Sequence, residues 1–149
     1  MIPKWVSEYV GIPFVEEGSS RTGSNCWGLC HLILKEQAGI NTPSYTEKEA
    51  SAVASKAIKQ IHDARVFRAA ITEDEIWNKV EEPRLFDCLL MASMSSDVRA
   101  KRVPCHVGLM LNAKQVIHVW SATDSVVMPI NHMAIRHSVI AFYRHKDLP

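Results

Sequence analysis

The stretch Asn25-Cys26-Trp27-Gly28-Leu29 marks the point where a polar loop turns into a helix. The loop before it, residues 18–24, carries two glycines among serine, threonine and arginine. Asn25 is a good N-cap residue, because its side-chain oxygen can accept a hydrogen bond from a backbone N–H of the first turn. Apolar residues then recur at helical spacing up to Gly39, so we expect a helix over residues 26–38.

A cysteine at the first position of a helix is well placed to act as a nucleophile. The helix dipole at Cys26 favours thiolate over thiol. The free N–H groups of the same turn can bind a developing oxyanion. An isolated cysteine is more often a small buried apolar residue, so this interpretation requires a base elsewhere in the chain. We interpret Cys30, one turn later, as a core residue.

Two histidines, His106 and His118, supply that base. His106 directly precedes residues 107–111 of one predicted strand and continues it, and His118 falls within another, residues 116–120. A thiol, an imidazole that deprotonates it and a second polar group that orients the imidazole are the minimum equipment for thiol-based acyl transfer. We therefore predict that His106 is the general base and that His118 orients it and shares its charge.

The turn between the two strands decides whether the rings can meet. If residues 112–114 form a three-residue loop, Leu111 pairs with Gln115 and His118 lies opposite Gly108. His106 is then the diagonal neighbour of His118, at roughly 7–8 Å between backbones, and Gly108 has no side chain to separate the rings. A two-residue loop would send the rings to opposite faces. We predict the three-residue loop.

Length and composition bound the remaining possibilities. The chain has 149 residues, which suits a single domain spanning residues 1–149. A net charge of +1 gives no electrostatic reason to expect nucleic acid as a partner. Without a long apolar run or a secretory signal, we expect no membrane span and synthesis in the cytoplasm. In that reducing compartment we expect the four cysteines to be free thiols.

The rest of the chain divides into helices first and strands afterwards, which indicates an α+β fold. We predict helices over residues 3–10 and 46–61 and a short one leading from Thr72 into Val80. We predict an antiparallel meander of about five strands, with an exposed loop at residues 93–104. The predicted strands cover residues 85–91, 107–111, 116–120, 125–128 and 139–143.

These motifs resemble those of the NlpC/P60 cysteine peptidases. The resemblance rests on N-C-W-G-L at residues 25–29, H-V-G-L-M-L at 106–111 and I-H-V at 117–119, in this order. Residues 9–14, the G-S-S-R-T-G loop and residues 42–45 resemble the phage and prophage tail-associated branch. The resemblance spans residues 9–145. It implies a papain-like fold, with the nucleophile helix packed on an antiparallel sheet.

The resemblance also implies an activity and a set of roles. It implies cofactor-free hydrolysis of bacterial cell-wall (peptidoglycan) stem peptides, often at the bond between a γ-D-glutamyl residue and a diamino acid. Cys26 would be the nucleophile with its backbone N–H in the oxyanion hole, His106 the base and His118 the third polar residue. The implied partners are the peptidoglycan stem peptide and phage tail proteins, and the implied location is a virion or its tail.

Two residues depart from the family pattern. Asn25 stands where the family usually has aspartate, and it can still cap the helix. Phe14 stands where the family often has a tyrosine that helps at the oxyanion, so another group must serve. Three further residues near the cysteine are candidates for substrate contacts: Ser24, Arg21 and Trp27.

Three other interpretations of the same residues are open. Cysteine and histidine at positions 26, 30, 31, 105 and 106 contain enough ligand types for a zinc site, but adjacent residues of a strand point in opposite directions, and we predict no metal. The domain could be a non-catalytic tail module that keeps the fold for assembly. It could also be an acyltransferase with the same three residues.

Overall fold

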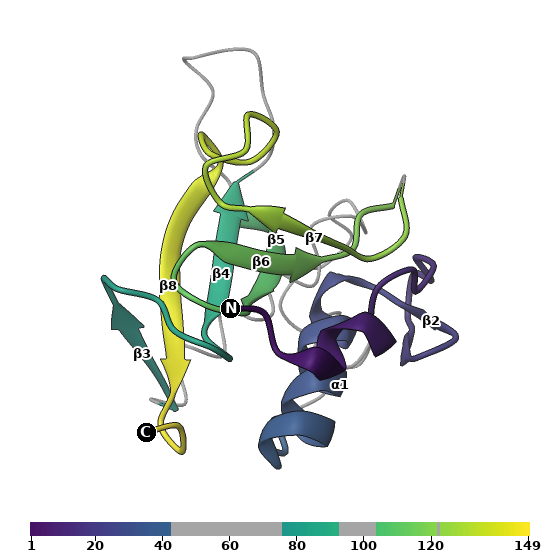
Figure 1. Ribbon diagram of the computed structural model, residues 1–149, viewed down its shortest axis with the longest axis horizontal. Coiled ribbons are helices and arrows are strands. Elements are labelled where there is room, and N and C mark those ends of the chain that lie inside the picture. The colour runs from purple at the N-terminus through teal and green to yellow at the C-terminus, as the bar shows by residue number, and fades with distance from the viewer. Residues whose placement is uncertain (43–75, 93–103, 122) are drawn as a thin grey trace, which may run out of the picture.

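The structure is a computed structural model that describes residues 1–42, 76–92, 104–121 and 123–149. One α-helix packs against an antiparallel sheet, which confirms the predicted α+β class (Figure 1). The strands of this sheet follow the order β3-β8-β4-β5-β6-β7. The elements are η1 (Lys4–Glu8), β1 (Ser19–Ser20), β2 (Gly23–Ser24), α1 (Cys26–Ala38), β3 (Trp77–Val80), β4 (Cys88–Ala92), β5 (Pro104–Met110), β6 (Gln115–His118), β7 (Val126–Pro129) and β8 (Val139–His145).

Helix α1 has the boundaries that the sequence predicts. The Asn25 side-chain oxygen accepts a hydrogen bond from the Gly28 N–H at 2.6 Å, which makes Asn25 the N-cap. Gly39 ends the helix in the left-handed conformation at φ 68°, and the Ile40 N–H then donates to the Leu34 carbonyl at 3.0 Å. Local capping therefore fixes where Cys26 lies: at the first helical position.

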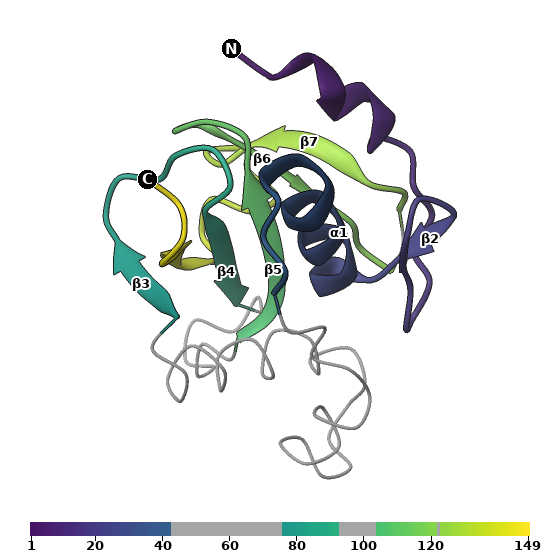
Figure 2. The ribbon, with the colours of Figure 1, turned by 90° about the horizontal axis from the view of Figure 1, so that it is seen from below.

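The sheet is curved and buries side chains on both faces. In Figure 1 the strands β6 and β7 run across the direction of β4 and β8, and in Figure 2 helix α1 lies over β5. Residues of β5 and β6 alternate between two apolar clusters. The cluster that includes α1 contains Val107, Leu109, Leu111, Ile117 and Val119, and the second cluster contains Leu89, Met91, Met110, Val116 and Ile135.

Several predicted elements differ from the structure. The prediction of a helix up to Val80 was wrong, because Trp77–Val80 is strand β3, paired with β8. The predicted helix 3–10 is the shorter 3₁₀ helix η1, and the predicted loop 18–24 contains the β1–β2 hairpin. Strand β8 inserts between β3 and β4, so only β4 to β7 form a meander.

Two predicted elements concern residues that the structure does not describe. The predicted helix over 46–61 and residues 93–103 of the predicted loop lie outside the described residues. Among the described cysteines, Cys26, Cys30 and Cys88 form no disulfide bond and are buried. No helix in the described part of the chain is long and apolar enough to cross a membrane.

The segment before α1 is fastened to the loop that follows β6. The Gly11 N–H donates to the Ser125 carbonyl at 2.9 Å, and the Ser125 N–H donates to the Ile12 carbonyl at 2.8 Å. The Ser125 hydroxyl also accepts from the Ile12 N–H at 2.8 Å and donates to the Tyr9 carbonyl. The segment after Ile12 continues beside β2, since the Ser24 N–H donates to the Pro13 carbonyl. The start of α1 and the end of β6 therefore lie in the same region.

Candidate active site

Asn25 orients the first turn of α1 with both ends of its amide. Its oxygen caps the helix, and its Nδ2 donates to the Glu16 carbonyl at 2.8 Å. A carboxylate at this position could cap in the same way but has no proton to donate to Glu16. Asn25 therefore ties the loop before the helix to the first turn through a hydrogen bond that an aspartate could not donate.

Gly28 allows the same loop to approach the first turn closely. A Cβ on Gly28 would lie 2.0 Å from the Gly18 oxygen, far closer than two non-bonded atoms can come. The Gly18 carbonyl also accepts a hydrogen bond from the Asn25 N–H at 2.9 Å. The space above Gly28 is thus filled by the chain's own backbone.

The two histidines meet as the turn length predicts. Leu109 lies opposite Ile117, and the Leu111 N–H donates to the Gln115 carbonyl at 2.8 Å across the three-residue loop. His106 Nε2 and His118 Nδ1 are 2.8 Å apart and share a hydrogen bond. Both rings therefore project from the same face of the β5–β6 pair, which confirms the predicted register.

Gly108 makes this diagonal contact possible. A Cβ on Gly108 would lie 3.2 Å from the Cβ of His118 and 2.6 Å from Cγ2 of Val116. Glycine is the residue that leaves this space free. The ring of His118 can then lean across the strand toward His106.

Burial keeps both imidazoles neutral at pH 7. It lowers the pKa of His106 well below the ordinary value of 6.5, and neighbouring His118 lowers it further. Burial also lowers the pKa of His118, to about 4. A neutral His106 has one ring nitrogen without a proton and can act as a base. With Nε2 bonded to His118, the nitrogen that would accept a proton is Nδ1.

Cys26 belongs to the buried cluster that reaches the strands carrying the histidines. This cluster includes Val107 and Val119, which adjoin His106 and His118 in the chain but point to the opposite face of their strands. Exposure falls from His106 at 8% and Cys26 at 5% to His118 at 1%. All three side chains are therefore buried, and His118 lies deepest.

The three candidate substrate contacts lie in different surroundings. Arg21 forms salt bridges with Glu8 and Glu36, both at 2.8 Å. Glu36 lies ten residues after Cys26 along α1, about 15 Å at 1.5 Å per residue. Trp27 is buried and contacts Trp77 edge to face. The roles of these residues toward a substrate stay predictions.

Ser24 and Phe14 are neighbours just before the helix. They form an isolated β-bridge, and Phe14 packs against the core that contains Cys26. Ser24 is completely buried, and its hydroxyl has no hydrogen-bond partner among the described residues. Phe14 therefore places an apolar ring beside a buried hydroxyl.

The described residues offer no group of three or more histidine, cysteine or acidic side chains arranged to hold a metal ion. His31, one member of the alternative zinc set, instead shares a hydrogen bond with Thr42 at 2.7 Å. His106 and His118 form a hydrogen bond with each other at 2.8 Å.

Trp120 is a neighbour of both histidines that the sequence analysis did not single out. Its ring centroid lies 4.6 Å from that of His118 and 5.8 Å from that of His106. Strand alternation supplied the signal, because residues 118 and 120 share a face.

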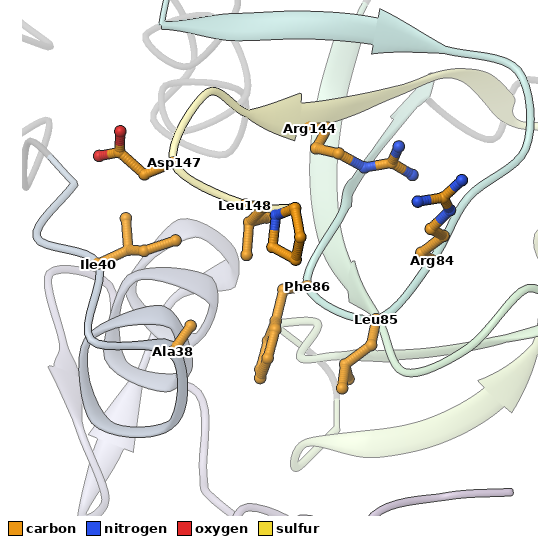
Figure 3. A pocket seen from close by; sticks show the side chains of 9 residues that line it. Ala38, Ile40, Arg84, Leu85, Phe86, Arg144, Asp147 and Leu148 are labelled. Atoms are coloured by element: carbon orange, nitrogen blue, oxygen red, sulfur yellow. The ribbon is translucent and has the colours of Figure 1, made fainter.

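A cavity of about 430 Å³ lies at the other end of α1. Figure 3 shows Ala38 and Ile40 on one side of it, Phe86 on another, and the guanidinium groups of Arg84 and Arg144 together. Arg144 is engaged with Asp87. Neither Cys26 nor the two histidines line this cavity.

Comparisons with known proteins identify the fold. The chain resembles the crystal structure of the NlpC/p60 domain of peptidoglycan hydrolase SagA, with a TM-score of 0.50 and 18% identity over 93% of this chain and 94% of that one. It also resembles an NlpC/P60 family protein from Bacillus cereus ATCC 10987, with a TM-score of 0.60 and 18% identity. A third similar structure is a protein of the NLP/P60 family, described as similar to lipoprotein, from Staphylococcus aureus subsp. aureus Mu50, with a TM-score of 0.55 and 17% identity.

Two of the similar proteins are much longer than this chain. The chain is covered to 92% in both of the last two comparisons but spans only 36% of the Bacillus cereus chain and 37% of the Staphylococcus aureus chain. No family profile matches the sequence, and no curated protein matches it. At these identities the likeness concerns the fold. The predicted papain-like architecture is thereby confirmed: this chain has the fold of NlpC/P60 domains.

Proposed function

We propose that this protein is a cysteine peptidase of the NlpC/P60 type that hydrolyses peptidoglycan stem peptides. The observation that carries the proposal is the buried His106–His118 hydrogen bond, on strands against which the Cys26 helix packs. The position of Cys26 behind an N-cap and the fold shared with NlpC/P60 domains support it. One of the similar structures is described as a peptidoglycan hydrolase.

The proposed reaction uses the side chains of Cys26 and His106, the second oriented by His118, and one backbone group. Nδ1 of His106 takes the thiol proton of Cys26, and the thiolate attacks the carbonyl carbon of the substrate peptide. The Cys26 N–H, at the positive end of the helix dipole, binds the oxyanion. His106 then gives its proton to the leaving amine. Water, deprotonated by His106, hydrolyses the thioester and releases the acid.

A pair of matched variants tests the nucleophile. Cys26→Ala is expected to abolish release of stem-peptide fragments from purified peptidoglycan, measured by mass spectrometry, with an unchanged unfolding temperature. Cys30→Ala is the control, because Cys30 is also buried in α1, one turn later. We expect this control to stay within about threefold of the wild-type rate, since Cys30 takes no part in the proposed reaction and its side chain is small. Hydrolysis retained by Cys26→Ala would refute the assignment.

The rate at which a thiol-reactive probe labels each cysteine distinguishes a catalytic domain from a non-catalytic module. Iodoacetamide is expected to alkylate Cys26 faster than Cys30 or Cys88, because the helix N-terminus and, in the proposed reaction, the base His106 favour the thiolate. Equal, slow labelling of all three would favour the non-catalytic tail module. Labelling without hydrolysis, but with transfer of an acyl group to an added amine, would favour the acyltransferase.

The biological setting is part of the proposal. The resemblance to the phage and prophage tail-associated branch suggests synthesis in the cytoplasm of a bacterial host and incorporation into a tail. The peptidoglycan stem peptide would then be the substrate and tail proteins the partners. Co-purification with virions, detected by mass spectrometry of purified particles, tests this setting.

A further inference from the structure

The hydrogen bond to His106 uses Nδ1 of His118 and leaves the other ring nitrogen, Nε2, without a partner among the described residues. His118 is 1% exposed. A buried polar atom without a partner is rare in folded proteins and requires an explanation. The partner that this nitrogen needs depends on whether it carries a proton. A bare nitrogen needs a hydrogen-bond donor, and an N–H needs an acceptor.

The proposed reaction fixes where that proton is. Each neutral imidazole carries one proton, and the 2.8 Å bond between His106 Nε2 and His118 Nδ1 contains one of them. If His106 donates, its Nδ1 is bare and can act as the base, and His118 carries its own proton on Nε2. If His118 donates, His106 carries its proton on Nδ1 and cannot accept another there. Catalysis by His106 therefore requires His118 to hold an N–H at its unpartnered nitrogen.

Trp120 is the neighbour that can distinguish the two tautomers. Its ring and that of His118 are 4.6 Å apart at 83°, an edge-to-face contact. The face of an indole carries partial negative charge, so it attracts an N–H and repels a nitrogen lone pair. Trp120 is half-buried and packs against the second apolar cluster, which holds its ring in place.

We propose that Trp120 is a positioning residue whose indole face accepts the Nε2–H of His118 and thereby holds the histidine pair in the tautomer in which His106 is the base. This inference rests on the proposed function, because catalysis is what selects that tautomer. Trp120 acts through His118 and takes no part in the bonds that form and break. It supplies an acceptor for the N–H without offering a site to which the proton could move.

The tautomer can be read directly from the wild-type protein. In ¹⁵N spectra of histidine-labelled protein at pH 7, His118 is expected to show a protonated Nε2 and a bare Nδ1. Its Nε2 proton is expected to resonate upfield of the His106 Nε2 proton, because it lies over the indole ring. A bare Nε2 on His118 would overturn the inference, with no need for any variant to fold.

Two variants test the role of the aromatic face. Trp120→Phe keeps such a face and is expected to keep the wild-type tautomer and kcat. Trp120→Leu removes it and is expected to populate the second tautomer and to lower kcat about two- to fivefold at constant KM, which is the effect that one weak N–H···π contact can have. A wild-type tautomer in folded Trp120→Leu would overturn the inference. If the wild type did not hydrolyse peptidoglycan but its His118 tautomer still depended on Trp120, the proposed function would be refuted and the role of Trp120 would stand.

Discussion

His118 shows how burial of one residue links stability to pH. It lies 1% exposed, and its pKa in the folded protein is about 4, against 6.5 for an ordinary histidine. Between these two values the unfolded chain binds a proton that the folded chain does not. Protons therefore favour unfolding in this window, and stability rises with pH. The contribution is fully present above pH 6.5 and is lost as the pH falls toward 4.

Urea unfolding at several pH values measures this linkage. The wild-type free energy of unfolding is expected to fall by roughly 3 kcal/mol between pH 7 and pH 4 from His118 alone, the equivalent of the drop in its pKa. His118→Gln cannot titrate and is expected to show a flatter curve in that range, although it starts from a lower stability at pH 7. Parallel curves for both proteins would show that His118 does not titrate differently in the folded state.

At the scale of elements, the start of α1 depends on local chemistry that the sequence displays. The boundaries of the helix follow from an N-cap asparagine and a left-handed glycine, both of which act within a few residues. The histidine register likewise follows from turn length, because side chains alternate with a period of two along a strand. These parts of the candidate site could be predicted because no distant partner decides them.

Strand β3 shows where local rules fail. The Thr72–Glu75 pattern favours a helix cap, yet Trp77–Val80 is extended because the chain pairs it with β8, more than sixty residues away. Trp77 pairs with His145 and contacts its ring at 5.1 Å. A short segment takes the conformation that pairing with its partner strand requires, and the sequence of residues 72–80 does not predict which strand that partner is.

Variants of Asn25 test the two hydrogen bonds that fix the helix start. Asn25→Ala loses both the cap and the bond to the Glu16 carbonyl, so the free energy of unfolding is expected to fall by about 2 kcal/mol. Asn25→Asp keeps the cap and gains from the helix dipole but loses the donor, so its stability is expected to lie between the other two. Thermal unfolding ranks the three proteins. If alanine were as stable as asparagine, neither bond would matter.

At the scale of the whole molecule, one buried ion pair joins the sheet to the turn before β4. The Asp87 carboxylate is fully buried and accepts from Arg144 Nε at 2.8 Å and Nη2 at 2.6 Å. It also accepts from the Arg84 N–H at 2.7 Å. Asp87 is the one charged residue in the apolar run over which a strand was predicted, residues 85–91. The predicted start of that strand was wrong, because residues up to Asp87 form this turn and β4 starts at Cys88.

Removal of this carboxylate is expected to destabilise the molecule strongly. Asp87→Ala leaves Arg144 without its bidentate partner, and we expect a loss of about 3 kcal/mol in the free energy of unfolding. Glu8→Gln is the control, since the Arg21–Glu8 pair is exposed and should contribute less than about 1 kcal/mol. Denaturant titrations of both variants measure the difference. Equal losses would contradict the assignment of Asp87 to the buried framework.

The bonds between Ser125 and residues 9–12 have a consequence for synthesis. Ser125 and Ile12 are 113 residues apart, so the earlier segment leaves the ribosome long before its partner exists. Translation adds about 5–20 residues per second, which gives a wait of several seconds or more. During this interval the side chains of Tyr9 and Ile12, which are buried in the folded protein, have no partner strand or loop to cover them and can associate with other molecules.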